Sequence, residues 1–177
     1  MGKGRTFELT LSNNISDNTN NSIDSTTSGY SGNSSSGVAD VIILWESQGC
    51  GKAAYVEAKK RGGSAGNRTI MMDGSSDGDT GLDELHTLVH GSPDWATVAI
   101  ALSWPHRELV TLDAEKLLSH LEGKTTYPAA DRHGARLTDA ENISMVMPTL
   151  DDWESATAGE ADWRKLCVDV GVPEYKL

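Results

Sequence analysis

Two apolar segments separated by a short, glycine-containing turn most constrain the fold of this chain. The first, VADVIILWE at 38–46, is rich in β-branched residues, and the second, AAYVEAKK at 53–60, alternates before it becomes polar. The glycines of SQGCGK between them permit a tight reversal of the chain. We therefore predict a β-hairpin over residues 38–60.

Three charged side chains stand at the open end of this predicted hairpin. Asp40 opens the first strand, and Glu57 and Lys59 lie near the end of the second. Residues i and i+2 of a strand point to the same face, so Glu57 and Lys59 project together. Ala58, between them, is predicted to point toward the core. Pairing of the two strands brings Asp40 alongside Glu57.

Two converging carboxylates and a lysine suit the hydrolysis of a phosphodiester bond. Carboxylate oxygens are ligands that Mg²⁺ prefers, and the bound ion lowers the pKa of a water and neutralises charge on the phosphate. A lysine within reach orients the attacking water or stabilises the charge that develops on phosphorus. The metal or the lysine also offsets the repulsion between the two acids. We expect a Mg²⁺ site, with Mn²⁺ as the alternative ion.

The rest of the chain has the pattern of a mixed α/β domain. Residues 3–12 fit either a short helix or a strand, and 13–37 is almost entirely Asn, Ser, Thr, Asp and Gly, which predicts a polar loop. Hydrophobic periodicity predicts three helices, over 82–91, 113–123 and 160–171. It also predicts two further strands, over 94–104 and 107–113. We expect an α/β fold with a mixed sheet flanked by helices over 1–124, followed by a C-terminal extension of unknown role over 125–177.

The ordered acids and lysine resemble the signature of the PD-(D/E)xK nuclease superfamily, which has the restriction-endonuclease-like fold. The signature reads AD at 39–40 and EAK at 57–59, with Ala39 in place of the proline. GKGRTFELTL, followed by the Ser/Gly-rich SGYSGNSSSGVADVII, resembles the start of archaeal-type Holliday junction resolvases. ATVAIALSWPHRELVTLDAEKLL resembles the paired strands and helix that close that fold, so the resemblance covers roughly residues 2–122.

This resemblance implies further site residues and a function. An early helix of that family contributes a glutamate to the metal site, which is Glu8 here, and a mobile Ser/Gly loop precedes the metal-binding aspartate, here Asp40. The implied activity is Mg²⁺-dependent endonucleolytic cleavage of branched DNA by a homodimer, because a junction needs two symmetric cuts. Two features depart from the family pattern: the loop before Asp40 is long and Asn-rich, and the net charge is strongly negative.

Candidate DNA contacts come from the densest basic patch and from the serine-rich segment. The basic residues would contact DNA phosphates beside the metal site, whereas an ordinary solvated loop is the alternative interpretation. The serines can contact phosphate, although a flexible linker explains them equally well. The candidates are Ser35, Ser36, Lys52, Lys60, Arg61 and Arg68.

Two other functions remain open from the sequence. One is a restriction- or repair-type nuclease that acts on duplex or flapped DNA. The other is a non-enzymatic acidic or Ca²⁺-binding module, because the spacing of acids in DGSSDGDTGLDE at 73–84 fits an EF-hand loop. The short apolar piece before that loop favours a plain acidic turn instead.

His86 and His90 form a second, smaller candidate metal pair. They are four residues apart on the helix predicted over 82–91 and can bind a metal together. Without a third ligand at hand, we expect a partly exposed helix face.

The composition narrows the classes of partner and the cellular location. The chain has 177 residues and a formal net charge of −11, which argues against coating nucleic acid by bulk charge but allows a local basic patch. No run reaches the roughly 18 apolar residues of a membrane helix, and no signal-peptide pattern is evident. The two cysteines form no CxxC motif, so we expect free thiols in a reducing cytoplasm.

Overall fold

The protein has a mixed α/β architecture, as the sequence predicts. The computed structural model describes residues 3–27, 39–60, 70–75, 81–103, 109–121, 132–137 and 163–177. A five-stranded sheet has the order β1-β2-β3-β5-β6, and a separate two-stranded sheet joins β4 and β7. β3 and β5 run parallel, and the other neighbouring strands are antiparallel. The elements are α1 (Lys3–Asn18), β1 (Ile23–Thr27), β2 (Val41–Ser47), β3 (Cys50–Lys60), β4 (Ile70–Ser75), α2 (Gly81–Gly91), β5 (Thr97–Ser103), β6 (Val110–Asp113), α3 (Ala114–Leu121), β7 (Arg132–Leu137), α5 (Trp163–Asp169) and a 3₁₀ turn η1 (Glu174–Lys176).

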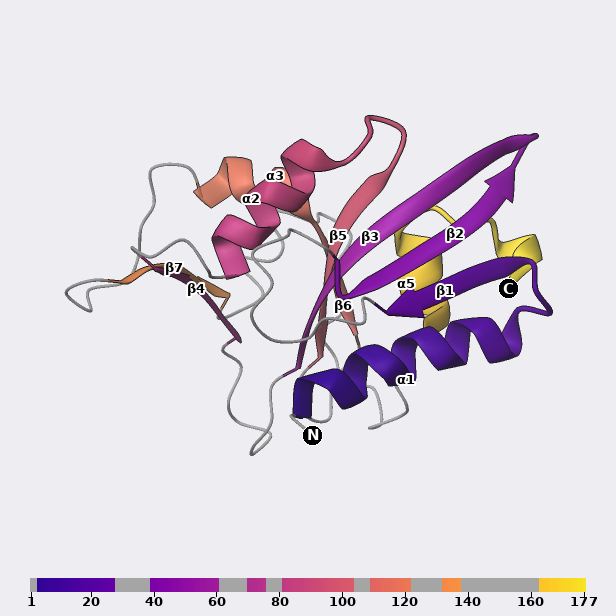
Figure 1. Ribbon diagram of the computed structural model, residues 1–177, viewed down its shortest axis with the longest axis horizontal. Coiled ribbons are helices and arrows are strands. Elements are labelled where there is room, and N and C mark those ends of the chain that lie inside the picture. Colours follow the sequence, from indigo (N-terminus) through magenta and orange to yellow (C-terminus); the bar gives the residue numbers. More distant parts are fainter. Residues whose placement is uncertain are drawn as a thin grey trace.

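Helices cover both faces of the five-stranded sheet (Figure 1). Leu11 and Ile15 of α1 and Leu166 of α5 share a buried core on one face. α3 packs against β5 and β6 on the other face, and α2 contacts α3. Because successive strand residues point to opposite faces, Ile100 is buried on the α3 side while its neighbour Ala99 belongs to the α1 side. None of the described helices is long and apolar enough to cross a membrane.

The predicted hairpin of β2 and β3 is confirmed, and its turn fixes the register. Gln48 and Gly49 have φ angles of 54° and 75°. Positive φ at both central residues is typical of a type I′ turn, whose twist matches that of the flanking strands. Seven residue pairs follow, from Ser47–Cys50 at the turn to Val41–Val56 at the open end.

The loop predicted over 13–37 is wrong for its first part. α1 extends into this segment, and β1 then pairs antiparallel with β2. Ile15 and Ile23 are almost completely buried and anchor the two elements. The Thr19 hydroxyl, also buried, bonds the carbonyls of both isoleucines, at 2.8 and 3.2 Å. Polar side chains of this segment therefore form hydrogen bonds between α1 and β1 at the edge of the core. The rest of the predicted loop lies outside the described residues.

The predicted boundary at residue 125 also needs correction, because the end of the chain belongs to the main core. α5 forms within the predicted helix at 160–171. Its Leu166 and Cys167 are fully buried, and Val172 beyond the helix is 3% exposed in the same core. Upstream, β7 pairs with β4. Residues 163–177 are therefore part of the folded domain and not an appendage.

The other predicted elements are confirmed with shifted ends. α2 and α3 form where the periodicity predicts them. One carboxylate oxygen of Asp113 accepts a hydrogen bond from the Lys116 backbone N–H at 2.9 Å, which is the interaction of an N-cap. β5 begins at Thr97, later than the predicted start at 94, and β6 is its antiparallel partner.

The Ca²⁺-loop alternative does not fit the structure. An EF-hand loop follows an entering helix, whereas Asp73 and Ser75 belong to β4, which pairs with β7. Residues 76–80 of the predicted loop lie outside the described residues. A strand therefore stands where an EF-hand needs its entering helix.

Both cysteines are free, as predicted, and their surroundings differ. Cys50 is exposed at the hairpin turn, and Cys167 is buried in α5. Burial raises the pKa of the Cys167 thiol to about 12, because desolvation disfavours the thiolate. Cys167 therefore stays protonated at neutral pH and acts as a small apolar core residue.

Leu166→Ala tests the assignment of α5 to the core. We expect the free energy of unfolding to fall by about 2–5 kcal/mol, because the truncation leaves a cavity against the sheet. Urea unfolding followed by circular dichroism measures this loss. Val168→Ala, at a position that is 42% exposed on the same helix, is the control and should change stability by no more than about 0.5 kcal/mol. Equal effects of the two substitutions would show that α5 does not pack as described.

Candidate active site

Asp40 and Glu57 face each other at the open end of the β2–β3 hairpin. The last residue pair of the ladder is Val41–Val56, and one step farther along both strands brings residue 40 opposite residue 57. Residues directly opposite on antiparallel strands have Cβ atoms about 4.5–5.5 Å apart. The predicted proximity of the two carboxylates thus follows from the register.

A backbone hydrogen bond holds the Asp40 side chain in place. The Ala58 N–H donates to Asp40 Oδ2 at 2.8 Å, so the carboxylate continues the hydrogen bonding of the strand pair beyond its last residue pair. The second oxygen, Oδ1, has no hydrogen bond to any described residue. Asp40 is half-buried, and this arrangement leaves one oriented oxygen available to a ligand.

Glu57 lies on a central strand between β2 and β5 and is 5% exposed. Lys59, two residues later on the same face, forms an ion pair with Glu57 Oε1. Ala58 between them is buried in the α1-side core, which confirms the predicted alternation. The Lys59 side chain is 29% exposed, so the ion pair consists of a buried carboxylate and a partly exposed ammonium group.

The electrostatics of this group favour a bound cation. Like charges directly opposite each other on a sheet are destabilising, and burial makes an uncompensated carboxylate more costly. The ammonium group of Lys59 offsets part of this cost at Glu57. Asp40 and Glu57 provide only oxygen ligands, which is the donor set that a hard divalent ion prefers over a soft one. The residues present therefore fit a Mg²⁺ or Mn²⁺ ion.

Glu8 is half-buried on α1, which runs antiparallel to β1. Ser25 bonds Ser12 and Ile23 bonds Thr19, so moving toward the start of the helix moves toward the end of β1.

Glu8 is one helical turn, about 6 Å, before Ser12, and Thr27 is about 7 Å beyond Ser25. Since Thr27 pairs with Val41, Glu8 lies at the same end of the sheet as Asp40. Among the described residues, however, no group of three or more His, Cys, Asp and Glu is close enough to hold a metal ion. Glu8 thus lies at the same end of the sheet as the acid pair, on the helix that covers the face opposite to the Glu57 side chain, and forms no three-acid cluster with the pair.

Lys52, a predicted DNA contact, is not beside the acid pair, which corrects the prediction. It lies five residues before Glu57 on β3, which is about 17 Å along a strand. The odd separation also directs it to the opposite face of the sheet. Lys52 lines a groove at the turn end of the hairpin with Glu46 and Trp95. Lys52 is close to the later basic residues in the sequence, but the extended strand separates it from them in space.

The remaining predicted DNA contacts have side chains outside the described part of the chain. Lys60 ends β3, two residues from Ala58, but its side chain lies outside the described part. Ser35, Ser36, Arg61 and Arg68 are also outside the described residues.

Two contributors to the site were missed in the sequence. The Ala58 backbone N–H that orients Asp40 leaves no signal in residue type, since every residue except proline has this donor. Tyr55, half-buried and two residues before Glu57, lies on the same face of β3. Tyr55 could have been identified from the sequence, because side chains two residues apart on a strand share a face. It adds an aromatic ring on the face of Glu57.

Comparisons with known proteins add one structural likeness. No family model matches this chain, and no curated protein matches it. Among solved structures, the chain is similar to Hjc from Archaeoglobus fulgidus, a Holliday junction resolvase from an archaeal hyperthermophile. The identity is 15% and the TM-score 0.47, over 80% of this chain and 93% of that chain.

The hydrogen bond between Ala58 and Asp40 predicts different stabilities for two substitutions. Asp40→Ala removes the acceptor and leaves a backbone donor unsatisfied, which should lower the free energy of unfolding by about 1–3 kcal/mol. Asp40→Asn keeps an acceptor oxygen and should retain most of that stability. Urea unfolding of the two variants measures the difference. If both lose the same amount, the carboxylate does not bond Ala58.

Proposed function

We propose that the protein is a Mg²⁺-dependent endonuclease that hydrolyses phosphodiester bonds in branched DNA. The proposal is supported by the hairpin register, which, extended one residue past the Val41–Val56 pair, sets Asp40 opposite Glu57, and by the ion pair of Lys59 with Glu57 on the same face. This is the arrangement implied by the resemblance to the PD-(D/E)xK nucleases and to archaeal-type Holliday junction resolvases.

Asp40 and Glu57 are the proposed ligands of the metal ion. Asp40 is suited to this role because the Ala58 N–H orients its carboxylate and leaves Oδ1 available. Glu57 is suited because it is held in a central strand, where its backbone is fixed by neighbours on both sides. A bound Mg²⁺ activates a water and neutralises charge on the scissile phosphate. Glu8 completes or tunes the site in this proposal, as the resemblance implies.

Lys59 has the role of the cationic group beside the metal ligands. Its ammonium group can donate up to three hydrogen bonds and is partly exposed, so it can reach both Glu57 and a group outside the protein. In the proposal it orients the attacking water or stabilises the negative charge that develops on the phosphate. Its ion pair with Glu57 keeps the ammonium group at the site before substrate arrives.

DNA binding has to be local in a protein with a net charge of −11. We propose that Lys60, Arg61 and Arg68 contact phosphates near the acid pair, together with Ser35 and Ser36. Lys52 is left out because it lies at the other end of the hairpin.

Symmetric cleavage of a junction requires two active sites, so the proposal includes a homodimer. We also propose that it acts in the cytoplasm. A restriction- or repair-type nuclease that cuts duplex or flapped DNA would use the same acids and is the second candidate. The branched substrate comes from the resemblance alone, whereas the acid pair serves either activity.

Glu57→Gln tests the chemistry and the substrate together. The substitution keeps the size of the side chain but removes its charge. We expect Mg²⁺-dependent cleavage of a labelled four-way junction to fall by on the order of 10³-fold or more, because loss of a metal ligand removes the ion's stabilisation of charge on the phosphate. The rate is measured over a salt series, beside a linear duplex of the same sequence, for which we expect much slower cleavage by the unsubstituted protein.

Glu46→Gln is the matched control, since Glu46 lies on the same hairpin near its turn. This variant should cleave the junction at the unsubstituted rate. Unchanged cleavage by the Glu57 variant would refute the active site. Equal cleavage of linear and branched DNA by the unsubstituted protein would favour the restriction- or repair-type nuclease.

A further inference from the structure

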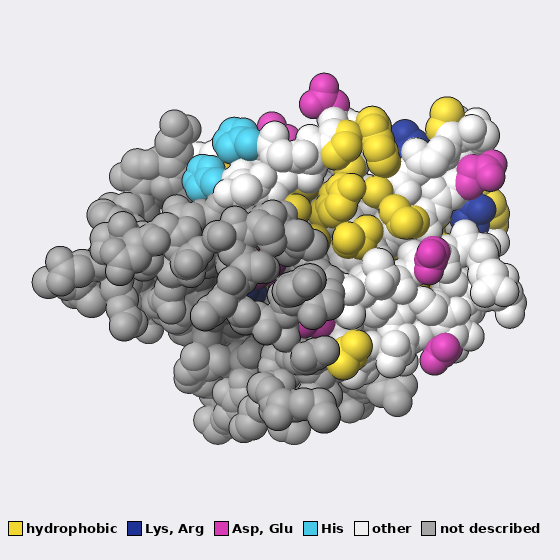
Figure 2. All heavy atoms as spheres, in the orientation of Figure 1, with side chains coloured by type: hydrophobic (Ala, Val, Ile, Leu, Met, Phe, Trp, Pro, Cys, Tyr) yellow, Lys and Arg dark blue, Asp and Glu magenta, His cyan; other side chains and the backbone are white. Residues whose placement is uncertain are grey.

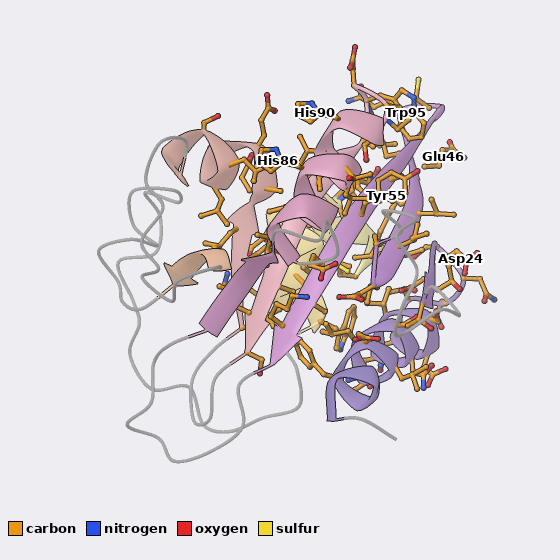
Figure 3. All side chains as sticks on the ribbon, turned by 60° about the vertical axis from the view of Figure 1, so that its left-hand side comes forward. Asp24, Glu46, Tyr55, His86, His90 and Trp95 are labelled. Atoms are coloured by element: carbon orange, nitrogen blue, oxygen red, sulfur yellow. The ribbon has the colours of Figure 1, made fainter. Side chains whose placement is uncertain are left out.

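α2 carries a pair of histidines on its outer side that the acid site does not use. His86 and His90 are both exposed, with ring centroids 6.0 Å apart and ring planes at 17°. Figure 2 shows the two side chains next to each other on the molecular surface, and Figure 3 shows both on α2. Leu85 and Leu88 of the same helix are buried, so the fold holds α2 with the histidine pair facing solvent.

We propose that His86 and His90 together bind a late first-row transition-metal ion, with Zn²⁺ as the representative. Imidazole nitrogens suit Zn²⁺, Ni²⁺ and Cu²⁺, whereas Mg²⁺ prefers oxygen. A nitrogen at about 2.1 Å from the ion places each ring centre about 3.3 Å away, so two rings that share one tetrahedral ion have centroids roughly 5.4 Å apart. The observed separation of 6.0 Å is close to this value, and the two exposed, nearly parallel rings have to turn about their side-chain bonds to aim a nitrogen at the same ion.

The spacing of the pair is what makes it a site. Residues four apart on a helix are neighbours on its surface, so once one imidazole binds the ion the second is held close to it. Among the described residues no third His, Cys, Asp or Glu joins the pair, and in this proposal water fills the other coordination positions. The site is therefore a bidentate, open one, and its affinity depends on both rings. It does not depend on the proposed nuclease function.

The test is calorimetric titration of the full chain with Zn²⁺, in buffer that contains saturating Mg²⁺ so that oxygen-lined sites are occupied. We expect His86→Gln and His90→Gln each to weaken binding on the order of tenfold or more, because either change removes the second ligand. In ¹⁵N spectra of the unsubstituted protein, Zn²⁺ should shift the ring nitrogens of these two histidines. Circular dichroism of each variant establishes that it is folded, as expected for an exposed position.

Two controls test whether binding depends on the four-residue spacing of the two histidines and not only on their number. The double variant T87H/H90Q keeps two histidines on α2 but at adjacent positions, which point about 100° apart. It should bind Zn²⁺ as weakly as His90→Gln. His133→Gln, on β7, should bind like the unsubstituted protein. Tight binding by T87H/H90Q, or unchanged binding by either single α2 variant, would overturn the proposal. Cleavage of DNA by the α2 variants should be unaffected, so failure of this site and failure of the nuclease proposal are distinguishable.

Discussion

The register of the β2–β3 hairpin is the constraint on which the candidate site depends. Strand side chains alternate with a period of two, so a slip of one residue would move Val41 and Ile43 out of the core and separate Asp40 from Glu57. The two-residue turn at Gln48 and Gly49 and the buried apolar face both specify the observed register. The forces that build the core thus also bring the acids together.

Burial of Glu57 is a cost that the fold alone does not explain. Its neighbours Val56 and Ala58 point into the core, and an apolar residue at 57 would satisfy the sheet equally well. A carboxylate on a central strand requires compensation, which Lys59 provides through its ion pair. Departures from simple packing rules are expected at functional sites. We interpret the acid pair in this way, with Asp40 held by the Ala58 N–H to form the second half of the site.

The hairpin and its charged residues could be predicted because their signals are local. Period-two alternation and a glycine turn are both contained within about 20 residues. The end of α1 and all of β1 could not be predicted in this way, because each has few buried apolar residues, chiefly Ile15 and Ile23. Their remaining stability comes from hydroxyl groups such as that of Thr19, which looks like loop composition in the sequence. Tertiary contacts determine the secondary structure of such segments.

Two other segments lie elsewhere in the fold than the sequence predicts, for a geometric reason. Lys52 was grouped with later basic residues by sequence distance, although an extended strand carries it to the far end of the hairpin. The C-terminal helix was recognised, but nothing local indicated that Leu166 would complete the core beside α1. The position of Glu8 at the Asp40 end of the sheet follows from the antiparallel packing of α1 on β1, which no local pattern contains, and its part in the site stays a prediction.

The most direct measurement is the position of a bound metal ion. Crystals of the protein grown with Mn²⁺, a substitute for Mg²⁺ that scatters anomalously, would locate it. We expect an anomalous peak within coordinating distance of both Asp40 Oδ1 and the Glu57 carboxylate. Occupied Mn²⁺ sites elsewhere with none between these two residues, in crystals where Asp40 and Glu57 are well ordered, would contradict the assignment.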